Sequence, residues 1–348
     1  MKKKIIFHAE WYPQSVVQMT WPHEDTDWLP ILDEVTECFI TIAKEIAKRE
    51  KLLIVCKNEA KTRAQLTGIN FNSVIFREII SNDTWARDHG GITVFIDEKP
   101  VIYDFVFNGW GMQFAAGFDN LITRRLVHEK TFAPAVDVVS MQPFILEGGS
   151  IDTDGKGTLL TTVSCLCSLN RNEHIKKEQI EAYLKDIFGL SRVLWLENGK
   201  LEGDDTGGHI DTLARFCDEN TIAYVKCTDK DNSCYKSLKE MEKELKSFRA
   251  LNGQPYRLIP LPMVYYADWE YEWQCERLPA TYANFLIING AVLVPFYQLE
   301  TDAVAAKALQ KAFPDREVIG IDCRPLVKQN GSLHCVTMQY PQGVVASV

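Results

Sequence analysis

Five ionisable or reactive residues recur at nearly regular intervals along this 348-residue chain: Asp88, Glu147, His209 with Asp211, and Cys335. The first two steps are 59 and 62 residues, and the step from His209 to Cys335 is 126 residues, about two such intervals. A cysteine nucleophile needs a nearby base or cation to hold it as a thiolate, and His209 is its natural partner. The carboxylates match the paired N–H donors of a planar guanidinium group. The set therefore predicts metal-free hydrolysis of a guanidinium group.

Each residue also has a simpler interpretation. Asp88 could pair with Arg87, Glu147 could be a solvated turn residue, and Cys335 could be a buried core thiol. His209 and Asp211 could be metal ligands, because alternate residues of a strand share a face. Their coincidence at matching positions of a repeat favours one shared site.

A zinc hydrolase would need a third strong ligand. The sequence contains no His-x-x-x-His pattern or clustered candidate near His209 and Asp211. The close pair Cys165-x-Cys167 has no histidine beside it in the sequence, which makes it a weak metal signal. We therefore expect no metal and no cofactor.

The residues lie in an internal repeat of strand, strand, helix and strand. The predicted units have first strands, second strands, helices and third strands at 91–96, 101–107, 119–128 and 135–139; 144–152, 158–162, 173–188 and 193–196; 209–216, 221–225, 233–251 and 256–261; and 283–289, 291–296, 302–312 and 317–321. The two ends supply a fifth unit from residues 334–340, 18–21, 30–49 and 52–56.

One such unit cannot bury its apolar sheet face alone, so five units must close on one another. We predict an α/β fold, a five-bladed α/β propeller of ββαβ repeats with pseudo-fivefold symmetry, in which residues 1–348 form one domain. Equivalent positions of a closed ring point at its axis, so the reactive residues should converge there. A doubly wound sheet is the alternative, but paired strands before every helix argue against it.

Composition narrows the partners. The chain is 46% hydrophobic and 24% charged, with a formal net charge of −9, which disfavours nucleic acid and suits a small cationic substrate. The N-terminal apolar run is only Ile5–Phe7, too short for a signal peptide, and no stretch is long enough to span a membrane. Ten irregularly spaced cysteines suit a reducing compartment. We expect a cytoplasmic protein; a homo-oligomer stays open.

Several motifs together resemble the agmatine deiminase family. They are Glu10-Trp-Tyr-Pro, Trp21-Pro-His, Asn82-Asp-Thr-Trp-Ala-Arg-Asp88, Phe107-Asn-Gly-Trp-Gly111, Glu147-Gly-Gly-Ser150, Leu169-Asn-Arg-Asn172, Asp204-Asp-Thr-Gly-Gly-His-Ile-Asp211 and His334-Cys335. They occur in the family's order and cover nearly the whole chain. The resemblance implies the guanidino-modifying superfamily with its pentein fold, whose relatives include bacterial-type peptidylarginine deiminases.

The resemblance implies hydrolysis of agmatine to N-carbamoylputrescine and ammonia, a step toward putrescine. Cys335 would attack the guanidinium carbon and form a covalent thiouronium intermediate. Asp88 and Asp211 would clamp the guanidinium nitrogens. His209 would protonate the departing ammonia and then deprotonate the attacking water, while Glu147 would bind the guanidinium side and orient His209.

Three further residues match positions that bind the rest of the substrate: Trp85, Trp110 and Asp205. An aromatic face and a carboxylate could together hold agmatine's far ammonium group. The chain departs from the family pattern at Gly207 and in the glycine-poor stretch 330–333, both beside the expected pocket. Deimination of peptidylarginine or free arginine, an inactive propeller used as a binding module, and a metal hydrolase remain alternatives.

Overall fold

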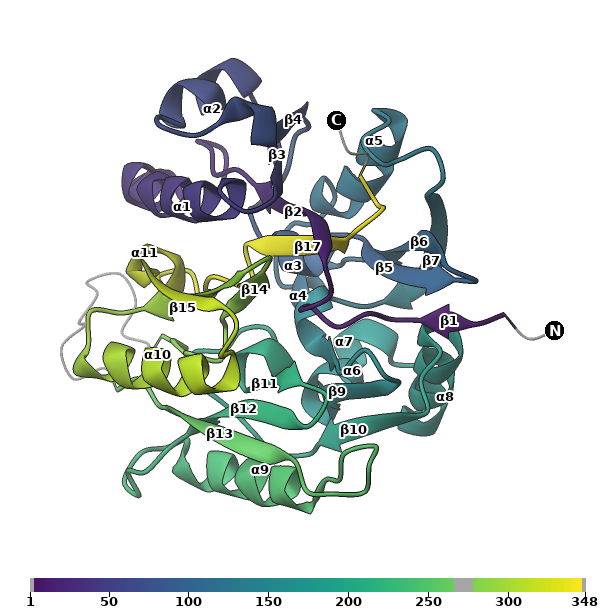
Figure 1. The fold of residues 1–348 in the computed structure, drawn as a ribbon, viewed down its shortest axis with the longest axis vertical. Coiled ribbons are helices and arrows are strands. Elements are labelled where there is room, and N and C mark those ends of the chain that lie inside the picture. Colours follow the sequence, from purple (N-terminus) through teal and green to yellow (C-terminus); the bar gives the residue numbers. More distant parts are fainter. Residues whose placement is uncertain (1–2, 266–277, 346–348) are drawn as a thin grey trace.

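The computed structural model describes residues 3–265 and 278–345, and the strands of these ranges form five separate sheets (Figure 1). In four of them the first and second strands are antiparallel and the third is parallel to the second. These sheets contain β5 (Ile92–Ile96), β6 (Lys99–Val106) and β7 (Asp137–Ile145); β8 (Ile151–Thr153), β9 (Thr158–Thr162) and β10 (Arg192–Leu196); β11 (Ala214–Asp218), β12 (Thr221–Lys226) and β13 (Arg257–Pro262); and β14 (Leu286–Ile288), β15 (Ala291–Phe296) and β16 (Glu317–Asp322).

The fifth sheet joins the two ends of the chain. Strand β17 (Thr337–Pro341) pairs antiparallel with β2 (Gln14–Thr20), which pairs in parallel with β3 (Lys51–Cys56). A further parallel strand, β4 (Val74–Glu78), extends this sheet, and β1 (Ile5–Ile6) extends the sheet of β5. The strand order of the predicted repeat is therefore present in all five sheets.

A helix follows the second strand of each sheet, and the longer ones lie on the outside of the molecule in Figure 1. These helices are α1 (Leu32–Ala47), α5 (Ile122–His128), α8 (Lys177–Phe188), α9 (Tyr235–Ser247) and α10 (Glu300–Ala312). In α1, Val35, Phe39, Ile42 and Ile46 recur at helical spacing and are fully buried. One apolar face thus fixes each helix on its sheet.

Shorter elements connect the units. The helices are α2 (Glu59–Gln65), α3 (Ala86–His89), α4 (Gly109–Met112), α6 (Val163–Leu166), α7 (Leu169–Asn172) and α11 (Arg324–Val327), and the 3₁₀ turns are η1 (Leu29–Ile31), η2 (Phe71–Ser73), η3 (Asp119–Leu121), η4 (Gly148–Ser150) and η5 (Ile210–Thr212).

Two predicted boundaries are wrong. The strand expected at 144–152 is divided, because Phe144 and Ile145 end β7 whereas β8 begins only at Ile151. The helix expected at 173–188 begins at Lys177, after the separate turn of α7. In both places an apolar run continues across a turn, so hydrophobicity alone misses the boundary.

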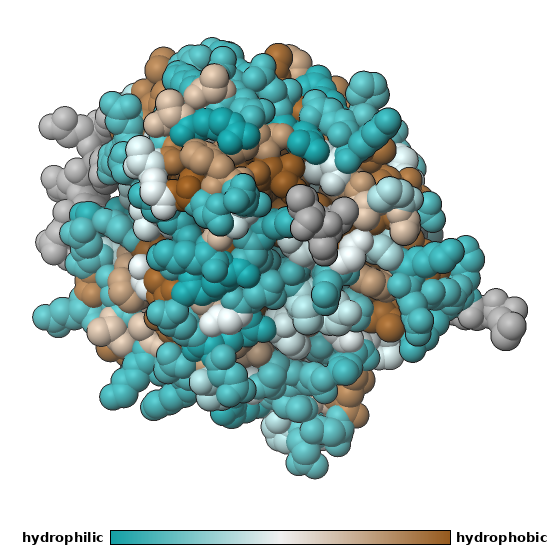
Figure 2. All heavy atoms as spheres, turned by 45° about the horizontal axis from the view of Figure 1, so that its top comes forward, coloured by the Kyte–Doolittle hydropathy of each residue, from teal (hydrophilic) through white to brown (hydrophobic). Residues whose placement is uncertain are grey.

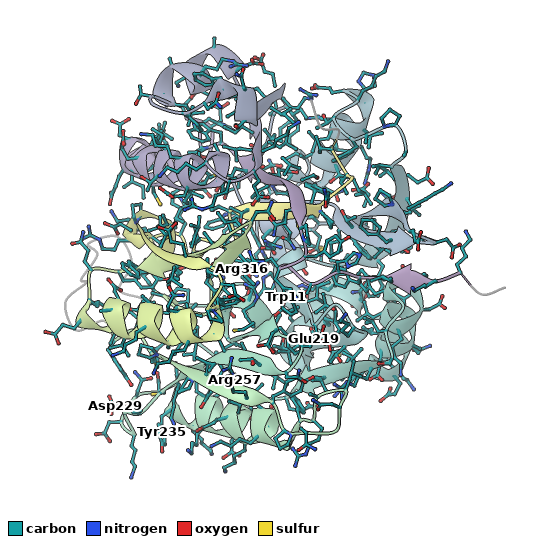
Figure 3. All side chains as sticks on the ribbon, viewed as in Figure 1. Trp11, Glu219, Asp229, Tyr235, Arg257 and Arg316 are labelled. Carbon is teal, nitrogen blue, oxygen red and sulfur yellow. The ribbon has the colours of Figure 1, made fainter. Side chains whose placement is uncertain are left out.

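The N-terminal segment before β2 runs into the interior, where Figure 3 places Trp11 near Arg316. Arg316 Nη2 donates to the Trp11 carbonyl oxygen at 3.0 Å, and the Gln14 amide donates to Asn289 Oδ1 at 3.1 Å. These contacts hold the segment against the β14–β16 sheet, with Glu10 buried.

The outer surface is mainly hydrophilic on the face shown in Figure 2, with smaller apolar patches between the polar side chains. Across residues 3–265 and 278–345, no helix has the length and apolar character needed to cross a membrane.

Candidate active site

Five short turns, one before the first strand of each sheet, bring the predicted reactive residues together. Each turn is closed by a backbone hydrogen bond from residue i+3 to the carbonyl oxygen of residue i. The turns begin at Trp85, Glu147, His209, Thr281 and His334. The reactive residues therefore precede the strands, which corrects the strands predicted to start at 209 and 334. A helical turn can direct a side chain inward where an extended strand would alternate its faces.

The five proposed catalytic residues lie together and are buried. Asp88 Oδ1 is 3.6 Å from His209 Nδ1, and Cys335 Sγ is 3.9 Å from Asp211 Oδ2. One ligand atom each of Glu147 and His209 lies within 4.8 Å of the other. Residues separated by up to 247 positions therefore form one cluster.

Gly149 lies at the middle of this cluster. A Cβ atom built on it would be 2.6 Å from His209 Nδ1, 2.8 Å from Asp88 Oδ1 and 3.0 Å from Asp211 Oδ2. Any side chain there would displace one of these groups. The Gly-Gly of the Glu147-Gly-Gly-Ser150 motif therefore provides the space in which the side chains converge.

Asp88 is held from two sides. Its Oδ1 accepts from the Gly149 amide and its Oδ2 from Trp110 Nε1, both at 2.9 Å. Burial raises the pKa of Asp88, while the nearby His209 opposes this rise and Asp211 adds to it. A cation bound between Asp88 and Asp211 would remove the repulsion between them.

Glu147 faces Arg171 of α7. Arg171 Nε lies 2.8 Å and 3.0 Å from the two carboxylate oxygens, and Arg171 Nη2 donates to the Thr206 carbonyl oxygen at 2.6 Å. Arg171 is the arginine of the Leu169-Asn-Arg-Asn172 motif, and the sequence gave no partner for it. It ties Glu147 to the loop that precedes His209.

His209 has no hydrogen bond on either ring nitrogen within the described part of the chain. Burial lowers its pKa, but Asp88, Cys165 and Asp211 outweigh burial and raise the pKa well above its ordinary value. His209 is therefore positioned to carry a proton and to donate it to a group that enters the site.

Asn284 contacts the thiol of Cys335 and was missed by the sequence analysis. Its Nδ2 lies 3.4 Å from Cys335 Sγ, and its Oδ1 accepts from the His334 amide at 2.9 Å. Asn284 occupies the equivalent turn of the fifth sheet, which the spacing of ionisable residues skipped. An amide that neither ionises nor reacts gave no chemical signal, but its repeat position was available.

Burial raises the pKa of the Cys335 thiol well above its ordinary value, and Asp211 and Asp88 add to this effect. The Asn284 amide acts in the opposite direction. In this environment Cys335 is a thiol, and a bound cation beside Asp88 and Asp211 would favour its ionisation.

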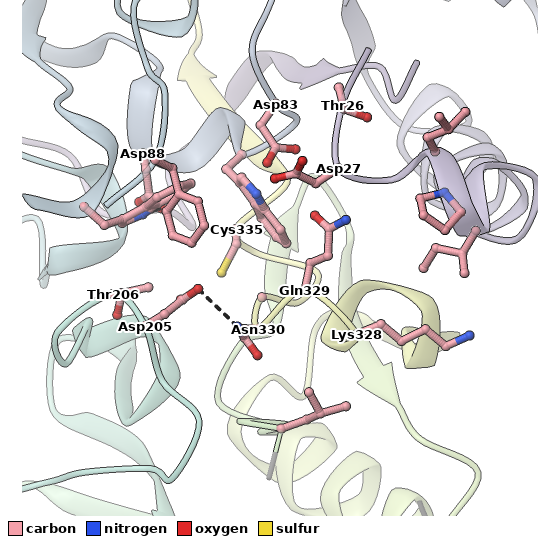
Figure 4. Close-up of a pocket in the computed structure, with 18 residues that line it drawn as sticks. Thr26, Asp27, Asp83, Asp88, Asp205, Thr206, Lys328, Gln329, Asn330 and Cys335 are labelled. Carbon is pink, nitrogen blue, oxygen red and sulfur yellow. Dashed lines mark hydrogen bonds between the residues drawn. The ribbon is translucent and has the colours of Figure 1, made fainter. Parts of the chain in front are cut away.

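A pocket of about 590 Å³ leads to Asp88 and Cys335 (Figure 4). Trp85 and Trp110 line it, with their ring centroids 6.5 Å apart. Asp205 lies on its wall, where its Oδ2 accepts from Asn330 Nδ2 at 3.2 Å, the dashed contact of Figure 4. The three expected substrate-binding residues thus line one pocket that ends at the cysteine.

Comparison with known proteins identifies the family. The family model of the Porphyromonas-type peptidyl-arginine deiminases matches residues 6–341. The chain belongs to this family. Agmatine deiminase from Pseudomonas putida is 32% identical over 366 residues, covering 97% of this chain and 96% of that protein. The expected family is confirmed.

Two solved structures of similar proteins show the same α/β fold. Agmatine deiminase from C. jejuni, a cysteine-to-serine variant with substrate bound, is 40% identical with a TM-score of 0.90, covering 98% of this chain and 97% of that one. A Porphyromonas gingivalis protein described as a candidate arginine deiminase is 56% identical with a TM-score of 0.94, covering 99% and 100%. The predicted α/β class is confirmed.

The stretches in which this chain departs from the family pattern lie beside the pocket. Gly207 has a φ of +83°, a left-handed conformation that favours glycine. A Cβ atom on Gly331 would lie 2.1 Å from the Trp85 ring. The stretch 330–333 therefore packs directly against the aromatic wall of the pocket.

The argument that His209 has no companions able to bind a metal needs correction. One ligand atom each of Glu147, Cys165 and His209 lies within 4.8 Å of the other two. Cys165 reaches this place from α6, because the chain folds back after β9. Arg171, however, already binds both oxygens of Glu147 and adds a positive charge that would repel a metal ion. This donor set therefore fits an ion pair better than a metal ion.

Proposed function

We propose that this protein hydrolyses agmatine to N-carbamoylputrescine and ammonia through a covalent intermediate on Cys335. The observation that supports this most is the arrangement around the thiol. A buried cysteine, a histidine and paired carboxylates lie together at the inner end of a pocket walled by tryptophan. We also propose that residues 1–348 form a single domain, in which the five sheets are the five blades of a propeller around this site.

The paired carboxylates would bind the guanidinium group. Asp211 Oδ1 is buried and has no hydrogen-bond partner within the ranges that the structure describes. Such a group normally has a partner, so a substrate N–H donor is its natural complement. Asp88 would bind from the opposite side, and the substrate's positive charge would relieve the repulsion between Asp88 and Asp211.

Attack would then follow from charge balance. The Cys335 thiolate would bond to the guanidinium carbon, and His209 would donate its proton to the departing nitrogen, which leaves as ammonia. Neutral His209 would next take a proton from water as that water attacks the thiouronium carbon. Collapse would break the carbon–sulfur bond, release N-carbamoylputrescine and restore the thiol. Glu147, fixed by Arg171, would orient His209.

The pocket favours a substrate with a second positive charge. Its wall contains Asp27, Asp83 and Asp205, and Lys328 is the only lysine or arginine among the described lining residues. Lys328 Nζ contacts Glu34 at 2.7 Å. Free arginine would bring an α-carboxylate toward these acidic groups, so agmatine, with an ammonium group there, fits better.

An ammonia-release assay tests the proposed activity. Agmatine, arginine, a blocked arginine peptide and methylated arginine are compared at equal concentrations. We expect the highest kcat/KM for agmatine. Faster release from a blocked arginine peptide would assign the protein to peptidylarginine, and no release from any of the four would favour the inactive binding module.

Asp205→Asn should weaken agmatine binding by about 1–3 kcal/mol, because the variant loses a half-buried charge opposite the distal ammonium. Burial raises the pKa of Asp205 to about 6. Its carboxylate becomes protonated as pH falls through this value, so KM for agmatine should rise below about pH 6 in the unmodified protein. The measurement is KM against pH for both proteins. A guanidine without a second amine is the control; an equal loss for both substrates would place the ammonium elsewhere.

Activity should survive complete chelation, because Arg171 occupies the carboxylate of the Glu147, Cys165 and His209 set. Turnover of agmatine is measured after dialysis against EDTA, with metal content determined on the same sample. Activity that disappears with the metal and returns with zinc or manganese would refute the cysteine mechanism and support the metal-hydrolase alternative.

A further inference from the structure

A buried histidine connects Asp211 to a carboxylate on the far side of the site. His334 Nδ1 lies 2.7 Å from Asp211 Oδ2, and His334 Nε2 lies 2.7 Å from Glu10 Oε2. All three side chains are buried. Both contacts are hydrogen bonds to carboxylates only when both ring nitrogens carry protons, that is, when His334 is an imidazolium.

His334 lies behind the reactive residues. It precedes Cys335, just as Arg87 precedes Asp88 and Gly148 precedes Gly149. His334, Arg87 and Gly148 line a separate cavity of about 40 Å³, which Glu10 also lines. The same turns thus present one set of groups to the pocket and a second set to the opposite side.

Glu10 is held as a carboxylate at this far side. Burial alone would raise the pKa of Glu10, but Arg215, His334 and Arg87 outweigh burial and hold it well below its usual range. Arg215 Nη2 donates to Glu10 Oε2 at 2.7 Å, and the Ile287 amide donates to Oε1 at 2.7 Å. Glu10 therefore offers a fixed negative charge to His334.

Asp211 responds to this support differently from Asp88. Burial would raise the pKa of Asp211, but the bond to His334, with the charges of His334, His209 and Arg215, lowers it instead. In Asp88 burial prevails and the pKa is raised. The bond to His334 uses Oδ2 of Asp211 and leaves Oδ1 without a partner among the described residues.

We propose that Glu10, acting through His334, is a positioning residue that keeps Asp211 ionised with Oδ1 directed at the guanidinium group. Glu10 and His334 touch no substrate atom; they fix the charge and orientation of a group that does. This inference rests on the proposed deimination of agmatine. It explains why the Glu10-Trp-Tyr-Pro segment is buried against the β14–β16 sheet, 324 positions from its histidine partner.

The first experiment measures kcat/KM for agmatine against pH in the unmodified protein, Glu10→Gln, His334→Gln and the double variant. The groups that face His334 are Glu10 and Asp211 in contact, with Arg215, Arg87 and Asp152 nearby. Loss of the imidazolium charge should raise the pKa of Asp211. Asp211 then becomes protonated at higher pH, so the acidic limb of the profile should move upward by about one unit.

At neutral pH, Glu10→Gln should lower kcat/KM at least about tenfold, with partial recovery at higher pH. The double variant should lose no more than His334→Gln alone, because both substitutions interrupt one path. A loss that is uniform across pH with an unmoved limb, or losses that multiply in the double variant, would overturn the proposal. If Glu10→Gln does not fold, an unmoved limb in His334→Gln overturns it equally.

Asp152→Asn is the matched control. Asp152 is also a buried carboxylate beside Arg215, with Oδ2 3.4 Å from Arg215 Nε, but it makes no hydrogen bond to His334. Its acidic limb should stay where it is in the unmodified protein. A limb that moves as far in Asp152→Asn as in Glu10→Gln would assign the effect to general charge loss and overturn the proposal.

A second readout does not depend on agmatine. ¹⁵N NMR of histidine side chains distinguishes imidazolium from neutral imidazole, and the His334 signal is assigned by its loss in His334→Gln. We expect an imidazolium at pH 7 in the unmodified protein and a neutral ring in Glu10→Gln. A neutral ring in the unmodified protein overturns the proposal. Absent ammonia release from agmatine together with an imidazolium would instead refute the proposed substrate.

Discussion

Replacing Cys335 by serine is expected to lower kcat for agmatine at least about 10⁴-fold. A serine hydroxyl has no comparably acidic state and forms no thiouronium, whereas the pocket around it stays the same. Binding should change only a few-fold, since Asp88 and Asp211 remain. Ammonia release measures the first expectation, and isothermal calorimetry with agmatine measures the second.

Cys167→Ser is the control for thiol loss. Cys167 is partly exposed and lies outside the pocket, so its variant should keep nearly full activity. A Cys335→Ser protein that turns over agmatine at a normal rate would contradict covalent catalysis on this residue. A variant that neither turns over nor binds agmatine would place Cys335 in substrate binding as well.

Gly149→Ala should reduce kcat/KM for agmatine by about 100-fold or more, although the change adds only one methyl group. The new Cβ atom would lie within 3.0 Å of His209, Asp88 and Asp211 at once, so at least one of them must move. A displacement of about 1 Å in a catalytic group is enough for a loss of this size. Steady-state kinetics measure it, and circular dichroism with thermal unfolding shows whether the fold is retained.

Gly117→Ala is the matched control. Nothing in the described structure lies within 4 Å of a Cβ atom built on Gly117, and this glycine is absent from those with a positive φ. Its variant should keep normal activity. Normal kinetics in Gly149→Ala would mean that the turn yields without moving the catalytic groups, and would contradict the role given to this glycine.

The repeat could be predicted because each unit combines strong local signals: two apolar strands, an amphipathic helix and a third strand. Strand β4 was not predicted. Its five residues follow helix α2, which falls outside the repeat, and only pairing with β3 reveals it. The boundary between Ile145 and Ile151 was wrong because the apolar pattern continues through a turn whose cause is the approach of Gly148 and Gly149 to other parts of the chain.

In the site, the ionisable residues were found because their types and spacing coincide. Their supporting partners were not. Arg171 and Glu10 look in sequence like ordinary charged residues, and their contacts with Glu147 and His334 arise only from the folded arrangement. Asn284 and Cys165 carried no charge that would draw attention. Long-range hydrogen bonding, unlike periodicity, leaves no trace in one sequence.

The sheet shared by Gln14–Thr20 and Thr337–Pro341 determines when the site can form during synthesis. Glu10 and β2 are among the first parts of the chain to leave the ribosome, whereas His334, Cys335 and β17 are among the last. Pairing between such distant segments makes folding slow, because the chain must close a very long loop first. A nascent chain that lacks its last few dozen residues has neither the thiol nor the strand that completes the first sheet. Reactivity toward guanidinium compounds is thus withheld until translation is nearly finished, and the N-terminal strand must wait for its partner without pairing with another chain.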